Sequence, residues 1–119
     1  MFYGKRMTQN YDNIIKEAKK LVTLIKNHEI TTQYQTSLTE INKNIKSQEL
    51  LNKLVLLGKE INDQLSQSKK ISPTQTKEFE SLKNELNKNN LVKTHISNQN
   101  AYSKMLQEII DLIKDPLAS

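Results

Sequence analysis

The amino-acid sequence predicts an all-α protein of about five helices, folded as antiparallel hairpins in an open bundle. Among its 119 residues are only two glycines, two prolines, four tyrosines and two phenylalanines, too few turn and strand formers for a β-sandwich. Apolar residues make up 35 % of the chain and recur every three or four positions, which is the spacing of one helix face. Connections of only a few residues should fold neighbouring helices back on one another.

The first helix is expected to begin at Asn10, a residue type that caps helix N-termini. Residues 1–9 show no apolar period and carry Gly4, Lys5 and Arg6, so they predict a flexible tail. Residues 10–116 then form a single domain. The apolar positions of the first helix are Tyr11, Ile14, Ile15, Ala18, Leu21, Val22 and Ile25.

Asn27–His28 interrupts this period, and a second helix with lower intrinsic propensity is expected to follow. Its apolar positions are Ile30, Tyr34, Leu38, Ile41 and Ile45. Ser47 is the expected N-cap of a third helix, which should run to about Lys70.

Gly58 lies on the apolar face of that helix, where glycine costs ~1 kcal/mol relative to alanine. Its presence there predicts a close helix crossing.

The fourth helix is expected to begin at Ser72–Pro73, which joins an N-cap to a first-turn proline. Asn89–Asn90 should end it, and Asp115–Pro116 should end the fifth helix. The apolar positions of these two helices are Phe79, Leu82 and Leu86, followed by Leu91, Val92, Ile96, Tyr102, Leu106, Ile109, Ile110 and Ile113.

The apolar stripes of the third and fifth helices are long for so small a protein. A helix of about 24 residues spans ~36 Å, and a single copy would leave part of such a stripe uncovered. The pattern predicts a symmetric homodimer, in which each copy covers the same patch of the other. The predicted interface consists of Leu91, Val92, Ile96, Tyr102, Leu106, Ile109 and Ile113.

The order and punctuation of these helices resemble the YlbF/YmcA (also YheA) family over about residues 10–115. The matching stretches are NIIKEAKKLVTLIKNHE at 13–29, SQELLNKLVLLGKEINDQL at 47–65, SPTQTKEFESLKNEL at 72–86 and NLVKTHISNQNAYSKMLQEIIDLI at 90–113. The resemblance implies a small bacterial protein that self-associates, usually as a dimer, and regulates other proteins without catalysis. Relatives assemble with partners that steer ribonuclease Y-dependent messenger RNA maturation, and so affect competence, sporulation and biofilm formation. Some members supply cysteines to an iron–sulfur cluster, which this cysteine-free chain cannot do.

Residues with catalytic or metal-binding chemistry are few. The absence of cysteine excludes disulfides, thiolate nucleophiles and cysteine-held zinc in this chain alone. His28 and His95 have no histidine or carboxylate four residues on, so both are predicted to be surface or boundary residues. Glu108, Asp111 and Asp115 share a helix face off the apolar stripe, which favours a solvated face over an acid–base pair. We therefore expect no catalytic, cofactor-binding or metal-binding residues.

The charge pattern leaves a second function open. The net charge of +5 lies in the N-terminal half, where Lys16, Lys19, Lys20 and Lys26 flank the apolar stripe of the first helix and could contact nucleic acid. Direct nucleic-acid binding is disfavoured, since the chain has a single arginine and few stacking aromatics. The longest apolar run, Leu54–Leu57, is far shorter than a membrane span. The expected function is a cytoplasmic regulatory adaptor that binds itself and other proteins; the alternative is a nucleic-acid-associated protein.

Overall fold

The computed structural model describes the backbone of residues 2–115 and the side chains of residues 10–115. Within this range the chain forms helices and no strands, which confirms the predicted all-α class. The elements are α1 (Phe2–Asn27), α2 (Glu29–Asn42), α3 (Ile45–Ser66), α4 (Pro73–Lys88) and α5 (Asn90–Lys114). They form an extended molecule measuring 68 × 37 × 24 Å.

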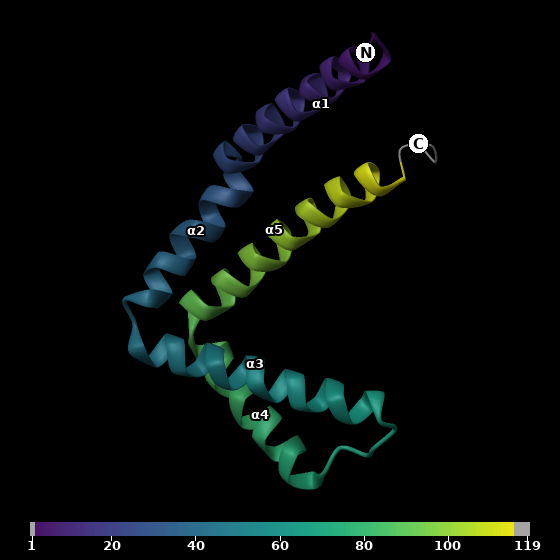
Figure 1. The fold of residues 1–119 in the computed structure, drawn as a ribbon. Helices are drawn as coiled ribbons and strands as arrows, with labels where there is room; N and C mark the ends of the chain where they lie inside the picture. Colours follow the sequence, from purple (N-terminus) through teal and green to yellow (C-terminus); the bar gives the residue numbers. More distant parts are fainter. Residues whose placement is uncertain (1, 116–119) are drawn as a thin grey trace.

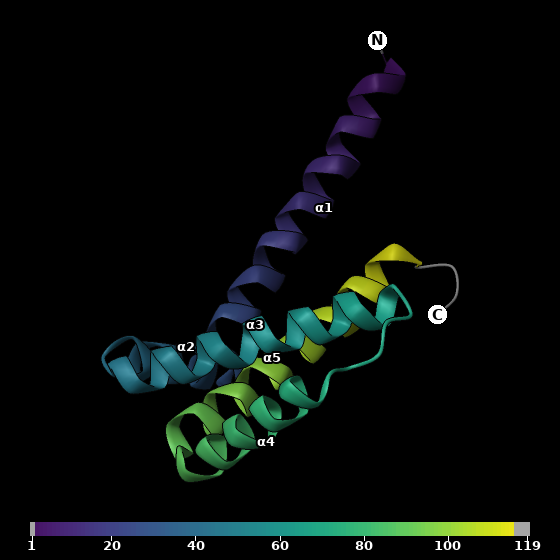
Figure 2. The same ribbon diagram turned by 90° about the horizontal axis from the view of Figure 1, so that it is seen from below.

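The helices form two arms that meet at one end (Figure 1). One arm contains α1, α2 and α5, and the other is the α3–α4 hairpin. The most extensive packing is between α2 and α5, which run in opposite directions. Seen from below, α1 projects away from the other four helices (Figure 2). Of the predicted antiparallel hairpins between consecutive helices, α3–α4 forms one and α1–α2 does not; the antiparallel pair α2–α5 joins helices that are far apart in the sequence.

The connection between α1 and α2 explains this difference. Only His28 separates the two helices, whereas an antiparallel helical hairpin uses a loop of about two to five residues. His28 adopts an extended backbone conformation, and its Nδ1 atom accepts a hydrogen bond from the Ile30 N–H at 3.1 Å. The chain thus bends at His28 without reversing, and α1 continues outward from α2.

The hydrophobic core lies where α2, α3, α4 and α5 converge. Its buried residues are Ile41, Leu50, Leu57, Leu82 and Val92, and its partly buried neighbours are Leu51, Leu54, Ile61, Leu86, Leu91 and Ile96. None of these residues comes from α1. The core is therefore built from four helices.

Capping residues set several of the helix ends. At α4, the Ser72 Oγ accepts from the Gln75 N–H at 3.2 Å, while the Gln75 Oε1 accepts from the Ser72 N–H at 3.1 Å. This reciprocal arrangement, with Pro73 in the first turn, confirms the predicted start. At α3 the predicted cap was wrong. Asn44 caps the helix by accepting from the Ser47 N–H at 3.0 Å, and Ser47 lies in the first turn.

Two other predicted ends differ from the structure. α1 begins at Phe2, so Asn10 lies inside the helix and does not start it. The division into a tail at 1–9 and a domain at 10–116 stays a prediction, and Met1 and Pro116 lie outside the described residues. α3 ends at Ser66, earlier than predicted, because Ser68 adopts a left-handed φ of 58° that stops the helix.

Among the described residues of one copy, no helix makes the predicted close crossing at Gly58. Gly58 is exposed, and no atom lies within 4 Å of the position that a Cβ would occupy. The apolar face of α3 meets its neighbours through Leu50, Leu54 and Leu57 instead. Nothing in the fold explains a glycine at this position.

Candidate interaction surface

The seven residues predicted as a dimer interface lie at very different depths. Val92 is completely buried in the core, with an exposed fraction of 0 %. It cannot contribute to an interface, so this part of the prediction was wrong. Ile113 is exposed. The other five are half-buried: Leu91, Ile96, Tyr102, Leu106 and Ile109.

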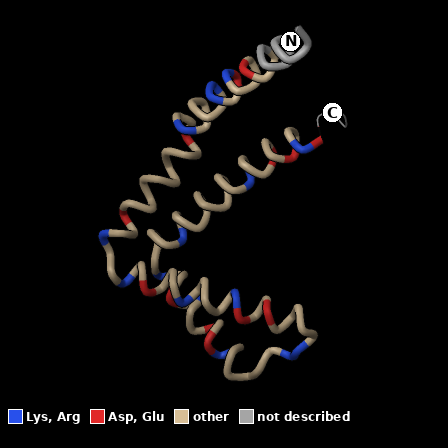
Figure 3. The backbone as a smooth tube through the Cα atoms, viewed as in Figure 1, with Lys and Arg blue, Asp and Glu red and all other residues tan. Residues whose placement is uncertain are grey.

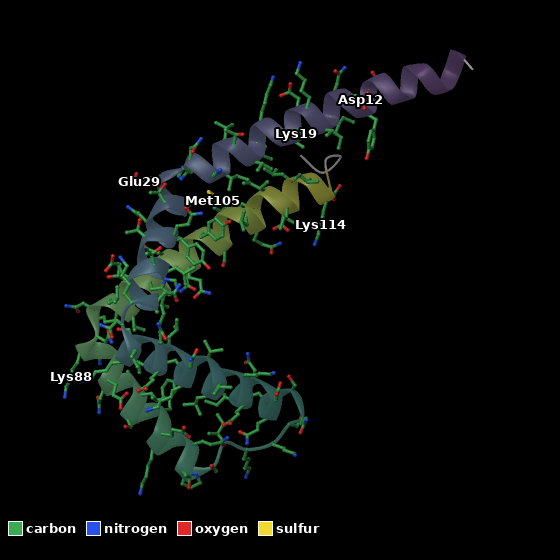
Figure 4. The ribbon with its side chains drawn as sticks, turned by 60° about the vertical axis from the view of Figure 1, so that its left-hand side comes forward. Asp12, Lys19, Glu29, Lys88, Met105 and Lys114 are labelled. Carbon is green, nitrogen blue, oxygen red and sulfur yellow. The ribbon has the colours of Figure 1, made fainter. Side chains whose placement is uncertain are left out.

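The helix α2 is what covers the first half of the predicted patch. The ring of Tyr102 stacks on that of Tyr34 from α2, with 4.8 Å between centroids and 8° between planes. Asn98 of α5 donates to the backbone oxygen of Gln33 at 3.1 Å. The two helices diverge beyond this region, where Met105 points from α5 toward α1 (Figure 4).

His95 is at the centre of this helix pair, which corrects its prediction as a surface or boundary residue. It is buried, stacks on Tyr34 at 5.6 Å, and its Nδ1 atom lies 2.8 Å from the Ser37 Oγ. The Ser37 hydroxyl also donates to the Tyr34 carbonyl at 3.0 Å. Because that hydroxyl has one proton, the His95 Nδ1–H donates to Ser37 Oγ.

The surroundings of His95 favour a structural role. Burial lowers the pKa of His95, so it is neutral near pH 7. A Ser–His pair can activate a nucleophile when a third group orients the base. Here both Ser37 and His95 are almost inaccessible, and no carboxylate within the described range bonds to either one. The pair links α2 to α5 and does not face a substrate.

A second hydrogen bond, partly buried, links the helix junctions. The Ser47 hydroxyl accepts from the Asn89 Nδ2 at 3.1 Å. The same Asn89 caps α5, with its Oδ1 accepting from the Val92 N–H at 3.0 Å. One side chain thus ties the start of α5 to the first turn of α3.

An uncovered apolar surface lies on α1 and the end of α5. We call it the open apolar face; its residues are Tyr11, Ile14, Ile15, Val22, Ile110 and Ile113, which are 38–65 % exposed. Within the described range, α2 is the only helix whose backbone approaches α1 within 8 Å. Beyond α2, α1 and α5 lie apart (Figure 1), so among the described residues no other helix covers the open apolar face.

Charged residues of opposite sign lie on the two helices that carry this face, but the acidic ones are on the side of α5 opposite Ile113. On α1, Lys16, Lys19, Lys20 and Lys26 are exposed, and Lys20 pairs with Glu17 at 3.0 Å. On the last turns of α5, Glu108, Asp111 and Asp115 are exposed, as predicted. Charges are sparse along α2 and the first half of α5, which appear mostly tan in Figure 3.

Sites of other kinds were also sought. No cluster of three or more potential ligands for a metal ion occurs in the part of the chain that the structure describes. Among the same residues, no helix has both the length and the apolar character needed to cross a bilayer.

Comparisons with known proteins identify relatives. Over residues 14–118 the chain matches a family model described as "Control of competence regulator ComK, YlbF/YmcA". It is similar to a UPF0342 protein of Leuconostoc citreum (strain KM20), with 24 % identity over 106 residues that cover 89 % of this chain and 90 % of the relative. No solved structure matches. The family match confirms the resemblance seen in the sequence.

Proposed function

The chain belongs to the YlbF/YmcA family, which is linked to control of the competence regulator ComK. On this basis we propose that it is a non-catalytic regulatory adaptor. In this proposal two copies pair and present further surfaces to other proteins in the cytoplasm. The proposal includes a part in ribonuclease Y-dependent RNA maturation, as the resemblance implies. It does not include a cysteine-ligated cluster, because the chain has no cysteine.

The open apolar face is the observation that carries the proposal. A fully exposed aliphatic side chain presents roughly 100 Å² of surface and a tyrosine up to about twice that. From their exposed fractions, the six side chains together present about 400 Å² of apolar surface. Interfaces are about 60 % apolar, so this area corresponds to about 650 Å² per copy. Two copies would bury about 1,300 Å², which is within the range of specific interfaces.

The geometry of α5 supports a second copy as the occupant. Residues 102, 106, 109 and 113 follow one another on a single helix face, so Ile113 continues the face that α2 covers at Tyr102. That face and the α1 stripe remain open on each copy. A two-fold arrangement that sets α1 of one copy against the end of the other copy's α5 would form this contact twice. It would cover the α1 stripe and the end of the α5 stripe on both copies.

Charge contributes to the same pairing only at a distance. Lys19 and Lys26 border the α1 stripe, whereas Glu108, Asp111 and Asp115 lie on the side of α5 away from Ile113, so the attraction between two copies acts at long range. Opposite charges at an interface rim steer association and fix orientation more than they add affinity. We therefore expect dimer formation to be faster at low salt, while the apolar stripes supply most of the stability.

The test is the solution mass, measured by light scattering after size exclusion. The wild type should have twice the chain mass of 13.8 kDa, and Ile14→Lys/Val22→Lys should have the chain mass while keeping its helical circular dichroism. Leu24→Lys is the matched control, because Leu24 is 68 % exposed on α1 but off the apolar stripe; it should remain dimeric.

Two results would contradict self-association through this face. One is a wild type that stays monomeric at tens of micromolar. The other is a stable dimer in the double variant, which would place the contact elsewhere.

The basic α1 supports one other function, binding to nucleic acid through phosphate contacts. The lysines at positions 16, 19, 20 and 26 are exposed, as that function requires. The aromatic rings are less suitable, since Tyr34 and Tyr102 stack on each other and cannot stack on bases. Phosphate contacts release counterions, so binding must weaken with salt. Unchanged RNA mobility at low salt would exclude this function.

A further inference from the structure

A cavity at the outer end of the α3–α4 hairpin lies outside the face proposed for self-association. Its volume is about 250 Å³, and it is lined by Ile61 of α3, Ile71 of the connecting segment, and Gln75, Thr76 and Phe79 of α4. Ile61 also packs against the core. The cavity therefore continues the apolar interior outward to the surface.

The local sequence explains why this cavity is open. The left-handed φ of Ser68 ends α3, and the Ser72 cap with Pro73 delays the start of α4. The irregular segment between them supplies Ile71 to the lining of the cavity. Ile71 and Phe79 remain 40 % and 46 % exposed, so an incoming group can reach both side chains.

The size of the cavity limits what it can hold. Sites for cofactors and drug-sized ligands have volumes of roughly 300–1,000 Å³, and this cavity is smaller. It matches a single large apolar side chain, the kind of anchor that dominates protein–protein contacts. Most of a partner anchored in this way would lie outside the cavity and contact the surface around it.

The segment that connects α3 to α4 beside the cavity is positively charged. Lys69 and Lys70 directly precede Ile71, and Lys83 lies one turn beyond Phe79 on α4, where i and i+4 share a face. No ion pair in the described part of the chain involves these three lysines. The segment 67–72 and the first turn of α4 contain no acidic residue. Glu78 and Glu80 are next to Phe79 in the sequence but about 100° from it around α4, so the charge that complements the connecting segment is negative.

We propose that this cavity docks an acidic segment of a partner protein, with one leucine-, methionine- or phenylalanine-sized side chain inserted between Ile61, Ile71 and Phe79. The partner's carboxylates contact Lys69 and Lys70. The inference rests on the adaptor function proposed above and supplies its second surface. The α3–α4 arm diverges from α1 and α5 (Figure 1), so a dimer can hold a partner on each hairpin.

The test uses a displayed library of random twelve-residue peptides, selected on the immobilised full chain. Enriched peptides should share one large apolar residue flanked by aspartate or glutamate. Their affinity is then measured by fluorescence anisotropy. Phe79→Ser should remove binding, and Lys69→Glu/Lys70→Glu should weaken it at least tenfold at low salt. Lys59→Glu/Lys77→Glu changes the net charge equally, on helix faces away from the cavity, and should alter affinity less than twofold.

Three results would overturn the inference. They are a library without an enriched motif, a motif without acidic residues, and binding that Phe79→Ser leaves intact. Light scattering on the same variants keeps the two proposals separate, because all of them retain the open apolar face. Loss of peptide binding in a variant that remains dimeric bears only on the proposed docking at the cavity. A monomeric wild type bears only on the proposed self-association.

Discussion

Replacing Val92 by alanine should lower the free energy of unfolding by about 2 kcal/mol. The Val92 side chain is 0 % exposed and packs with the other buried core residues. Each buried carbon group contributes about 0.8 kcal/mol through transfer from water, and Val→Ala removes two of them. The cavity left behind adds about 1 kcal/mol if the surrounding helices do not collapse into it. The better helix propensity of alanine offsets several tenths of a kcal/mol.

The assay is urea unfolding followed by circular dichroism, at one protein concentration for all variants, because association makes apparent stability depend on concentration. Val55→Ala is the matched control. It makes the same chemical change on α3, at a position that is 62 % exposed, so its effect should stay within about 0.5 kcal/mol. The urea midpoint should shift without a change in slope.

A Val92→Ala cost no larger than that of Val55→Ala would refute the reasoning. Val92 would then lie outside the core, and α5 would not pack on α2 and α3 as described. The predicted interface containing Val92 would again be possible.

Two further changes test other parts of the fold. Gly58→Ala should stabilise the protein by about 0.5–1 kcal/mol, because alanine favours the helix and no atom lies within 4 Å of the new Cβ; a lower melting temperature would reveal a close contact in the assembly. For His95, burial lowers the pKa of the folded state below its usual value of 6.5. The unfolded chain therefore binds a proton that the folded chain excludes, so stability is complete above about pH 6.5 and falls as the pH drops toward the lowered pKa. His95→Gln should flatten the unfolding free energy between pH 5 and pH 7, and an unchanged slope would contradict this account.

Periodicity predicted the number of helices and several of their ends correctly, because those features depend on local sequence. At Ser72–Pro73, cap, proline and apolar pattern all favour the same start, and the structure agrees. At the start of α3, two capping residues lie three positions apart. Asn44 caps the helix, and Ser47 directs its hydroxyl to Asn89. A bond between residues 42 positions apart leaves no local signal in the sequence.

The candidate interface was harder to predict, because an apolar stripe shows that a helix face is covered but not by what. The stripes of α1 and α5 look alike in the sequence. In the fold, α2 packs on the first half of α5 and helps to bury His95, and the core of α2, α3 and α4 buries Val92, while most of the α1 stripe stays exposed. A one-residue link at His28 decides this outcome, because it prevents α1 from folding back. The cavity beside Phe79 was missed for a similar reason, since Ile71 lies in a connecting segment without periodicity.

The attachment of α1 through α2 alone has a consequence for local unfolding. A helix that shares few contacts with the core opens without disrupting it, so its backbone amides exchange hydrogen through small fluctuations. Covering the α1 stripe with a second copy adds stability that grows with protein concentration. Amides of residues 10–27 should then exchange quickly in dilute solution and slowly in concentrated solution, while those around Val92 stay protected in both. The order of this one helix would follow the abundance of the protein, and any surface built on α1 would be present only when enough of the protein has accumulated.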